Sequence, residues 1–464
     1  VQDIFIRLGV FAGGFNLEAA SAICSPMDED QIFSGIETLL DNSLLRQVRS
    51  VSDEPRFDML HTIREYAQEK AEEAGLLDEL QFAHLSYFAS QMGGMLVADG
   101  FGEDTSLWLK RTEEEHDNYR AALAWGMDHP DQSVLPVITI LGQLVWFWYR
   151  HGYLQEGSEW TQRALDLVSD TGTSIPHALA LTGRGYLAMW SGDLVLSEAL
   201  ARKAVEICEQ LGFDEGLSMA KLGYGVTLIN LGRDQEAYPH LVDAVELYDQ
   251  QGQVWMKGTT LVHLANVSLG MGNPEQAIKW LEMAMPFMEK SSDIWSIAFA
   301  LNNYGEIART LGEYDKAEEY YRRTEALYKQ ADAKGDQARL VHTFGYIAQH
   351  KGDYDDAREL FVQSLNDFRE LGNHRGIAEC LAGLAGLAAV QGQYEWAAPL
   401  LSAAEKQLKS FGGAWWPADR VEIDRALEAI QSALGDRFEE KWAQGQSMGV
   451  ERAIAYALDG GEAQ

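Results

Sequence analysis

The stretch LGEYDKAEEYYRR, from Leu311 to Arg323, decides the fold, because the chain reads KGDYDDARELFVQ forty residues later. A period between 20 and 50 residues is the sequence signature of a repeat protein. The turn glycines recur every 40 residues, at Gly152, Gly192, Gly232, Gly272, Gly312, Gly352 and Gly392. A second series lies 20 residues further on, at Gly212, Gly252, Gly372 and Gly412, with Ser292 and Asp332 at the two remaining places.

Apolar residues recur at intervals of three and four between these turns, as they do from Phe299 to Leu311 and again from Tyr314 to Tyr328. This spacing places them on one face of a helix, and a glycine supplies the left-handed residue that ends it. Each segment has room for a helix of about 16 to 18 residues. The sequence therefore predicts seven units, each a pair of antiparallel helices.

Residue size also repeats in register with the turn glycine. Small residues lie seven before it, at Gly185, Gly225, Ala265, Gly305, Gly345 and Ala385, and five after it, at Ser197, Ala237, Ala277, Ala317, Ala357 and Ala397. Bulky residues lie nine after it, at Leu241, Leu281, Tyr321, Phe361 and Leu401. The pattern resembles the tetratricopeptide repeat (TPR), with a unit of 40 residues that lengthens both helices. It implies an all-α fold, an α-α superhelix in which each pair buries its apolar face against the next.

The segment before the repeats has a different pattern. Residues 30–42 suggest a helix, SLLRQVRS and EPRFDML two short strands, and HTIREYAQEKAEEAG a helix that ends at Gly75. The order helix, hairpin, helix is the outline of a winged-helix domain. We therefore expect a winged helix over residues 1–75, a helical linker over 76–133, the repeats over 134–411 and capping helices over 412–464.

Four stretches, FAGGFNLEAA, LLDNSLLR, RFDMLHTIREYA and WLKRTEEEHDNYRAALAW, together resemble the bacterial signal-transduction ATPases with numerous domains, or STAND regulators. In that family a nucleotide-binding domain precedes a winged helix and long-period helical repeats. The chain contains no Gly-Lys-Ser/Thr phosphate loop. We therefore expect that this chain is a segment that begins just after the ATPase domain. The segment itself would be no enzyme and would have no cofactor. ATP or ADP would be bound only by the missing ATPase domain.

The resemblance also suggests one nucleotide-sensing residue. In related plant immune receptors and animal apoptosis regulators, a histidine of the winged helix contacts the ADP phosphates. Aligning that motif on Arg64 to Ala67 places Leu60 at the histidine position and His61 one residue later. His61 is thus either a contact to nucleotide in the intact protein or a polar residue near a helix start.

The first helix of each unit is expected to line the concave groove. The repeat family's groove positions, carried over residue by residue, give the ligand-binding candidates Tyr186, Trp190, Asn230, Asn266, Asn302, Glu306, Arg309, Arg339, His342 and Tyr346. The groove changes from apolar in the early units to polar and partly basic in the fifth and sixth. Arg309, Arg339 and His342 could hold a carboxylate or another anion. The alternative is that Glu306 and nearby acidic residues pair with them.

The composition excludes several classes of function. Thirty-seven basic against 71 acidic residues give a net charge of −34, which disfavours nucleic acid and anionic membranes as partners. The segment DQIFSGIETLLDN, at the place of a recognition helix, has no Lys or Arg, so we expect no direct DNA binding. Three distant cysteines, Cys24, Cys208 and Cys380, indicate a reducing, cytoplasmic setting without a structural zinc or other metal site.

The hypothesis that follows is a sensor or scaffold. The groove would bind a peptide, protein or small-molecule inducer, and the winged helix would relay this to the upstream ATPase. The alternative is a constitutive protein–protein assembly module that senses no ligand. The sequence contains no HExxH, GxSxG or other catalytic set, so we expect no catalytic residues.

Overall fold

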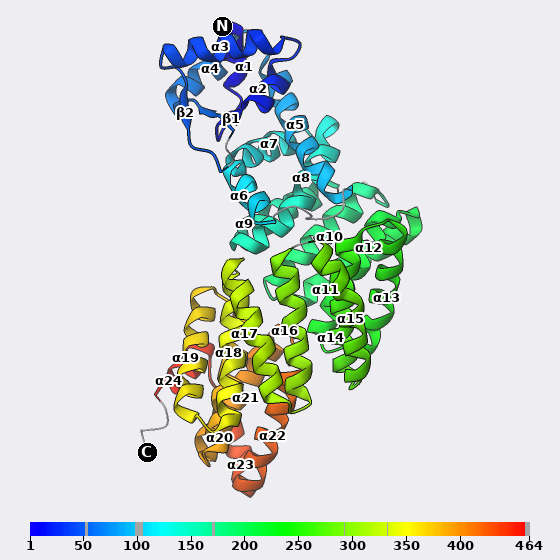
Figure 1. Cartoon of the computed structure of the whole chain (residues 1–464), viewed down its shortest axis with the longest axis vertical. Helices are drawn as coiled ribbons and strands as arrows, with labels where there is room; N and C mark the ends of the chain where they lie inside the picture. Colours follow the sequence, from blue (N-terminus) through cyan, green and yellow to red (C-terminus); the bar gives the residue numbers. More distant parts are fainter. Residues whose placement is uncertain (52–53, 98–104, 169–171, 292, 332, 460–464) are drawn as a thin grey trace. The chain divides into compact units, whose positions relative to one another are not determined.

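The computed structural model describes residues 1–51, 54–97, 105–168, 172–291, 293–331 and 333–459. The chain folds into two compact units, Val1–Arg184 and Gly185–Gln464. Both are built almost wholly from helices (Figure 1), and the described strands form one small sheet in the first unit. The predicted fold class, an all-α TPR-like superhelix preceded by a small winged helix, is confirmed.

The winged helix opens the first unit. Its elements are α1 (Gln2–Leu8), β1 (Phe15–Asn16), α2 (Leu17–Cys24), α3 (Glu29–Asp41), β2 (Arg46–Val48), β3 (Arg56–Asp58) and α4 (His61–Glu73). The predicted helix, hairpin and helix are all present, and Gly75 follows α4 with φ of +68°. The sequence did not reveal β1, which pairs with β3 so that Phe15 lies opposite Phe57. The strand order is β1-β3-β2, and Phe15 and Phe57 are both buried.

The rest of the first unit is helical. It comprises α5 (Leu77–Val97), α6 (Thr105–Glu114), α7 (His116–Asp128), α8 (Pro130–His151), α9 (Leu154–Val168) and the start of α10 (Ile175–Trp190). Helix α8 is long and apolar enough to span a membrane, with mean hydropathy 1.2. More than half of that stretch is nevertheless buried inside the protein. Its aromatic residues Phe147 and Trp148 are fully buried, as expected of a helix that forms the core of its unit.

A polar network ties the winged helix to α6 and α7. Asn118 accepts hydrogen bonds from the backbone amides of Ala12 and Gly13 and donates one to the carbonyl of Gly14. Arg56, a buried residue of β3, forms an ion pair with Glu115 and donates to the carbonyl of Gly13. Part of the acidic run 113–115 thus binds a buried arginine instead of facing solvent. The winged helix and the helices after it therefore belong to one compact unit.

The same core contains a pH-sensitive histidine. His84 is 2% exposed, packs between Phe11 and Phe88, and lies 3.4 Å from the amide oxygen of Asn118. Burial lowers the pKa of His84 from 6.5 to about 4. The unfolded chain therefore takes up this proton first as the pH falls, so stability decreases between pH 6.5 and pH 4.

We expect the free energy of unfolding of the first unit to fall by about 2 kcal/mol between pH 7 and pH 5 because of this one group. Urea denaturation at the two pH values measures the change. The variant His84→Gln, which cannot take up a proton, should show a decrease smaller by about that amount. An equal pH dependence in both proteins would contradict the assignment.

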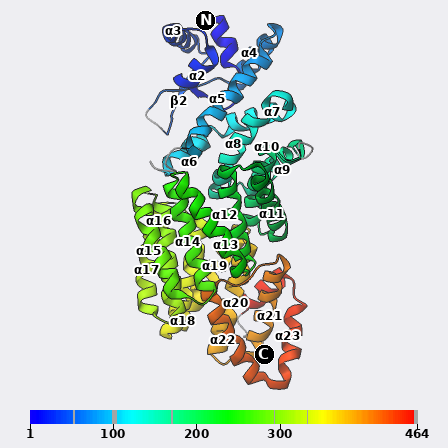
Figure 2. The same cartoon turned by 90° about the vertical axis from the view of Figure 1, so that its right-hand side faces the viewer.

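The second unit continues the helix pairs. It contains α11 (Leu194–Leu211), α12 (Asp214–Asn230), α13 (Asp234–Gln250), α14 (Val254–Gly270), α15 (Pro274–Ser291), α16 (Ile294–Thr310), α17 (Tyr314–Gln330), α18 (Lys334–Lys351), α19 (Tyr354–Glu370), α20 (His374–Val390) and α21 (Tyr394–Ser410). Consecutive helices lie side by side in the two views (Figures 1 and 2). Every glycine of the two predicted series has a positive φ, between +61° and +87°. Ser292 and Asp332 lie outside the described residues.

The repeated small residues let the two helices of a pair approach closely. A Cβ atom added to Gly305 on α16 would lie 2.3 Å from the ring of Tyr321 on α17. The corresponding distance from Gly345 to the ring of Phe361 is 2.7 Å. The small position seven before the turn therefore receives the bulky residue nine after it. That contact explains why glycine stands opposite both aromatic residues, Tyr321 and Phe361.

The chain ends with α22 (Pro417–Leu434), the short 3₁₀ helix η2 (Gly435–Arg437), α23 (Phe438–Gln446) and α24 (Val450–Leu458). Helices α23 and α24 pack on α21 and close the apolar core at the end of the stack. Helix α22 differs because it contacts α14 and α16 in addition to α20 and α21. It thus reaches helices that are far from it in the order of the repeats.

Candidate ligand-binding face

The candidate site lies on the first helices of the pairs in the second unit. We call α12, α14, α16, α18 and α20 the A helices, and the surface on which α22 lies the A face. The ten predicted groove residues lie on α10 and on four of these helices, α12, α14, α16 and α18. The structure brings Glu306 and Arg309 of α16 together with Arg339, His342 and Tyr346 of α18 in one network.

The early positions make local contacts. The hydroxyl of Tyr186 donates to the carbonyl of Met219, and its ring lies 5.4 Å from that of Trp190. Asn266 on α14 and Asn302 on α16 are half-buried. Asn230 at the end of α12 is different, because its amide oxygen accepts a hydrogen bond of 3.1 Å from Arg375 on α20. Asn230 on α12 thus contacts the last of the repeat units.

Arg309 is the centre of the network. It is 2% exposed, and its guanidinium donates to Glu306 at 2.8 Å and to Asp419 of α22 at 2.5 Å. The guanidinium also lies over the ring of Tyr346, 4.8 Å from its centre. Burial alone would lower the pKa of Arg309, but the carboxylates of Glu306 and Asp419 outweigh it and raise the pKa well above its ordinary value. Arg309 is therefore charged and neutralised by acidic residues of this chain.

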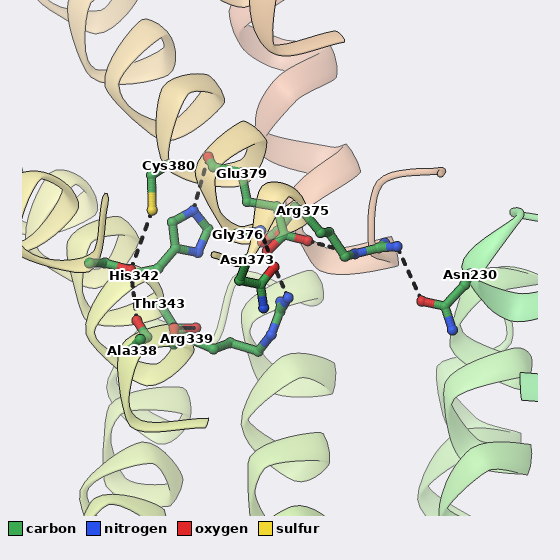
Figure 3. A network of polar contacts seen from close by, with 12 residues as sticks. Asn230, Ala338, Arg339, His342, Thr343, Asn373, Arg375, Gly376, Glu379 and Cys380 are labelled. Carbon is green, nitrogen blue, oxygen red and sulfur yellow. Dashed lines mark hydrogen bonds and ion pairs between the residues drawn. The ribbon is translucent and has the colours of Figure 1, made fainter. Parts of the chain in front are cut away.

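A second group of contacts lies between α18 and α20 (Figure 3). Arg339 donates to Glu379 at 2.7 Å, and the ring of His342 lies 3.2 Å from the backbone carbonyl of the same residue. Arg375 donates to the other oxygen of Glu379 at 2.9 Å and extends toward Asn230. Burial lowers the pKa of His342, so its imidazole is neutral near pH 7. Glu379 is thus shared by two arginines.

Residues 414–434, which we call the strap, cover the A face. The amide of Ala414 donates to the carbonyl of Asn230 at 2.9 Å, and the ring of Trp416 stacks on Arg375 and Arg339 at 4.4 and 5.4 Å. Glu422 lies 2.9 Å from the imidazole of His350 on α18. The strap therefore contacts four A helices by polar or cation–π interactions, and the same surface was expected from the sequence to bind a ligand.

Charge balance on the A face depends on the strap. Three buried or half-buried arginines, Arg309, Arg339 and Arg375, face the carboxylates of Glu306, Glu379 and Asp419. Burial would raise the pKa of Asp419, but the positive charges of Arg309 and Arg339 hold it below its ordinary value. The repeats alone supply two of the three carboxylates. The third comes from the strap, so without it these three arginines would face only two carboxylates.

Several buried polar atoms of this region have no hydrogen-bond partner within the described residues. They include Nε and Nη1 of Arg309, the amide oxygen of Gln349 and the indole nitrogen of Trp416. Gln349 holds the same position on α18 that Arg309 holds on α16, three residues before the turn glycine. Such atoms lose solvation without gaining a partner, so the strap leaves part of the A face's hydrogen-bonding capacity unused.

Sequence reasoning missed four residues of the network. Glu379 could have been found, because it is the first groove position of the seventh unit, 13 residues before Gly392. Arg375 lies one helical turn before it. Trp416 and Asp419 belong to no repeat, and no periodic signal connects them with the A face.

His61 lies away from this network, in the first unit. It is the first residue of α4, and its side chain is exposed, 3.8 Å from Glu65. This position leaves the imidazole accessible to solvent. Within the residues the structure describes, no group of three or more His, Cys, Asp or Glu side chains is arranged to hold a metal ion.

The comparisons agree with two domain types. Residues 1–72 match the family model of the winged helix-turn-helix domain, and residues 257–330 and 336–410 match that of the tetratricopeptide repeat. Neither is a catalytic domain type, and both occur in proteins that bind other molecules. The structure and the sequence thus define a winged-helix and TPR protein.

Among curated proteins, the chain is similar to proteins of Mycobacterium tuberculosis and Mycobacterium bovis whose names assign them provisionally to the HTH-type transcriptional regulators. The identity is 27% over 267 residues, covering 53% of this chain and 28% of each relative. The aligned part of this chain therefore spans little more than a quarter of the length of the relatives it matches.

Among solved structures, a Rap protein complexed with Competence and Sporulation Factor superposes with a TM-score of 0.57 at 12% identity, covering 82% of this chain and 99% of that chain. A STAND protein with a tetratricopeptide repeat sensor from Pyrococcus horikoshii covers 95% of this chain and 64% of that one, with a TM-score of 0.48 at 12% identity. At such low identity, the similarity to the Rap protein shows only that the two chains share a fold.

Proposed function

We propose that this chain is the sensing and regulatory part of a larger signalling ATPase of the STAND type. The A face binds a protein, peptide or small-molecule inducer, and the winged helix relays its occupancy to an ATPase domain upstream. A ligand can shift such a system only if it prefers the active arrangement over the resting one. We place the protein in the cytoplasm.

The main support is the buried arginine network on the A face. Buried charges are costly unless they are paired, and a structural stack of helices has no need for three arginines at one surface. Arg309, Arg339 and Arg375 therefore suggest recognition of an acidic group. The Rap protein of similar fold was crystallised in complex with Competence and Sporulation Factor, which agrees with a role of such repeats in binding a partner.

Relay through the winged helix is supported by its attachment to the helices that follow it. Asn118 and Arg56 bind the winged helix to α6 and α7, so a displacement of these helices would displace the winged helix with them. Direct DNA binding is not part of the proposal, because α3 contains no Lys or Arg and includes Glu29, Asp30, Glu37 and Asp41.

The alternative function is constitutive assembly, in which the repeats bind a neighbouring subunit and sense nothing. Light scattering over a range of protein concentrations separates the two. The sensor predicts a monomer whose mass is independent of concentration, because the strap already covers the A face. A mass that rises with concentration would favour assembly.

Nucleotide binding provides a second test of the proposal. We expect titration calorimetry with ATP and with ADP to show no binding to this chain, because the sequence has no phosphate loop to hold the phosphates. The matched control is an intact relative that includes its ATPase domain, which should bind ADP. Tight binding of ATP by the chain itself would overturn the assignment of the ATPase to a separate domain.

A further inference from the structure

The strap makes the contacts that a ligand of the A face would make. Trp416 stacks on two guanidinium groups, and the carboxylate of Asp419 pairs with a third. Both residues lie at the start of α22, where Trp416 is the N-cap and Asp419 lies in the first turn. An aromatic ring and a carboxylate three residues apart are thus presented together by the beginning of one helix.

We propose that the strap is a built-in competitor, and that the ligand of the A face is an acidic helical segment of a partner protein with the same arrangement. That segment has an aromatic residue followed three positions later by Asp or Glu, and it binds after displacing residues 414–425. The inference rests on the proposed function and names both its ligand class and its regulation.

The size of the occupied surface favours an extended partner over a small molecule. The strap contacts α12 at Asn230, α16 at Arg309, α18 at His350 and α20 at Arg375. All four contacts are made by residues 414–422, at the start of the strap. A small carboxylate could pair with Arg309, but it could not contact all four helices. A helical segment of similar length could replace every contact of the strap.

The unpaired atoms explain how a competitor could displace a tethered segment. The strap is attached to the repeats, so its effective concentration is high and an external ligand must bind better. Nε and Nη1 of Arg309 and the amide oxygen of Gln349 have no partner under the strap within the described residues. A partner with a second carboxylate that accepts from Nε and Nη1 of Arg309, or with a hydroxyl or amide that donates to the amide oxygen of Gln349, would gain affinity over the strap.

The experiment uses the full chain with a weakened strap. Asp419→Asn removes the charge that pairs with Arg309 and keeps the size of the side chain. The probe is a fluorescent peptide with the sequence of residues 412–434, and its binding is followed by anisotropy. We expect the Asp419→Asn chain to bind this peptide at least about ten-fold more tightly than the unaltered chain, because its A face is open more often.

Matched controls separate this effect from a general loss of stability. Asp424→Asn removes an exposed carboxylate from the same helix and should bind the peptide no better than the unaltered chain. A peptide with Trp416→Ala and Asp419→Asn should not bind either variant. Equal peptide binding by the Asp419→Asn and Asp424→Asn chains would overturn the proposal. If indole-3-propionate binds the Asp419→Asn chain as tightly as the peptide does, the inference that the ligand is an extended helical segment is wrong.

A second measurement uses the unaltered chain, so its result does not depend on whether a variant folds. Hydrogen exchange of the unaltered chain is followed with and without saturating isotope-labelled peptide, whose fragments differ in mass from those of the strap. We expect faster exchange of the α22 amides when the peptide is present. Unchanged exchange would overturn the proposal. If another inducer slows hydrogen exchange on the A face while the peptide does not, the strap is not a competitor, but the proposed sensing function is still supported.

Discussion

Replacing Arg309 by methionine is expected to lower the free energy of unfolding of the second unit by about 3–5 kcal/mol. The substitution keeps most of the side-chain volume but leaves the carboxylate of Asp419, which is 2% exposed, without its nearest cation. A buried charge that has lost its partner costs more than the pair contributed. Urea denaturation at pH 7, followed by circular dichroism, measures the change.

Two further variants test the physical reason. Asp419→Asn in the Arg309→Met background removes the unpaired charge, so the double variant should regain a large part of the lost stability. Arg369→Met makes the same substitution in an exposed pair, because Arg369 and Glu451 lie 3.0 Å apart at the surface. That variant should leave the transition almost unchanged. Similar losses for Arg309→Met and Arg369→Met would show that the buried network has no special role.

Gly305→Ala is expected to destabilise the second unit by about 1–3 kcal/mol. The new methyl group would lie 2.3 Å from the ring of Tyr321, which is fully buried. The ring is held in place because its hydroxyl donates a hydrogen bond of 3.0 Å to Glu306. Thermal or urea unfolding of the variant measures the loss.

Gly185→Ala is the matched control, since Gly185 holds the same position seven residues before a turn glycine. Its unit has the small Ala201 nine residues after the turn, and an added Cβ would lie 3.6 Å from the nearest atom, on Leu200. Alanine favours the helix over glycine, so this variant should be more stable by about 0.5–1 kcal/mol. Two changes of equal sign would contradict the packing explanation.

Much of the fold could be predicted from the sequence because its determinants are local. The glycines at fixed spacing end helices wherever they occur, and the apolar positions between them need only a neighbouring helix to cover them. The winged helix followed from one hairpin between two helices. Strand β1 could not be predicted, because two residues carry no periodic pattern and its pairing with β3 bridges about forty residues of chain.

The candidate site was less accessible to prediction. The register of the repeats predicted that Arg309, Arg339 and His342 lie on the first helices of their units, because position in the repeat determines which helix carries a residue. Their partners depend on contacts over long distances in the chain, such as Arg309 with Asp419, 110 residues later. Whether these arginines bind an external anion remains the proposal that the strap experiment tests.

The sequence by itself determined the helices, their pairing within each unit and the size of the residue at each contact, because these depend on spacing along one or two helices. Only the tertiary structure decided what covers the A face. Residues 414–434 reach α12, α16 and α18 because the stacked pairs bring distant units close to the end of the chain. The oppositely charged residues of the strap and of the A helices belong to segments that share no repeat. No local sequence pattern therefore predicts their pairing.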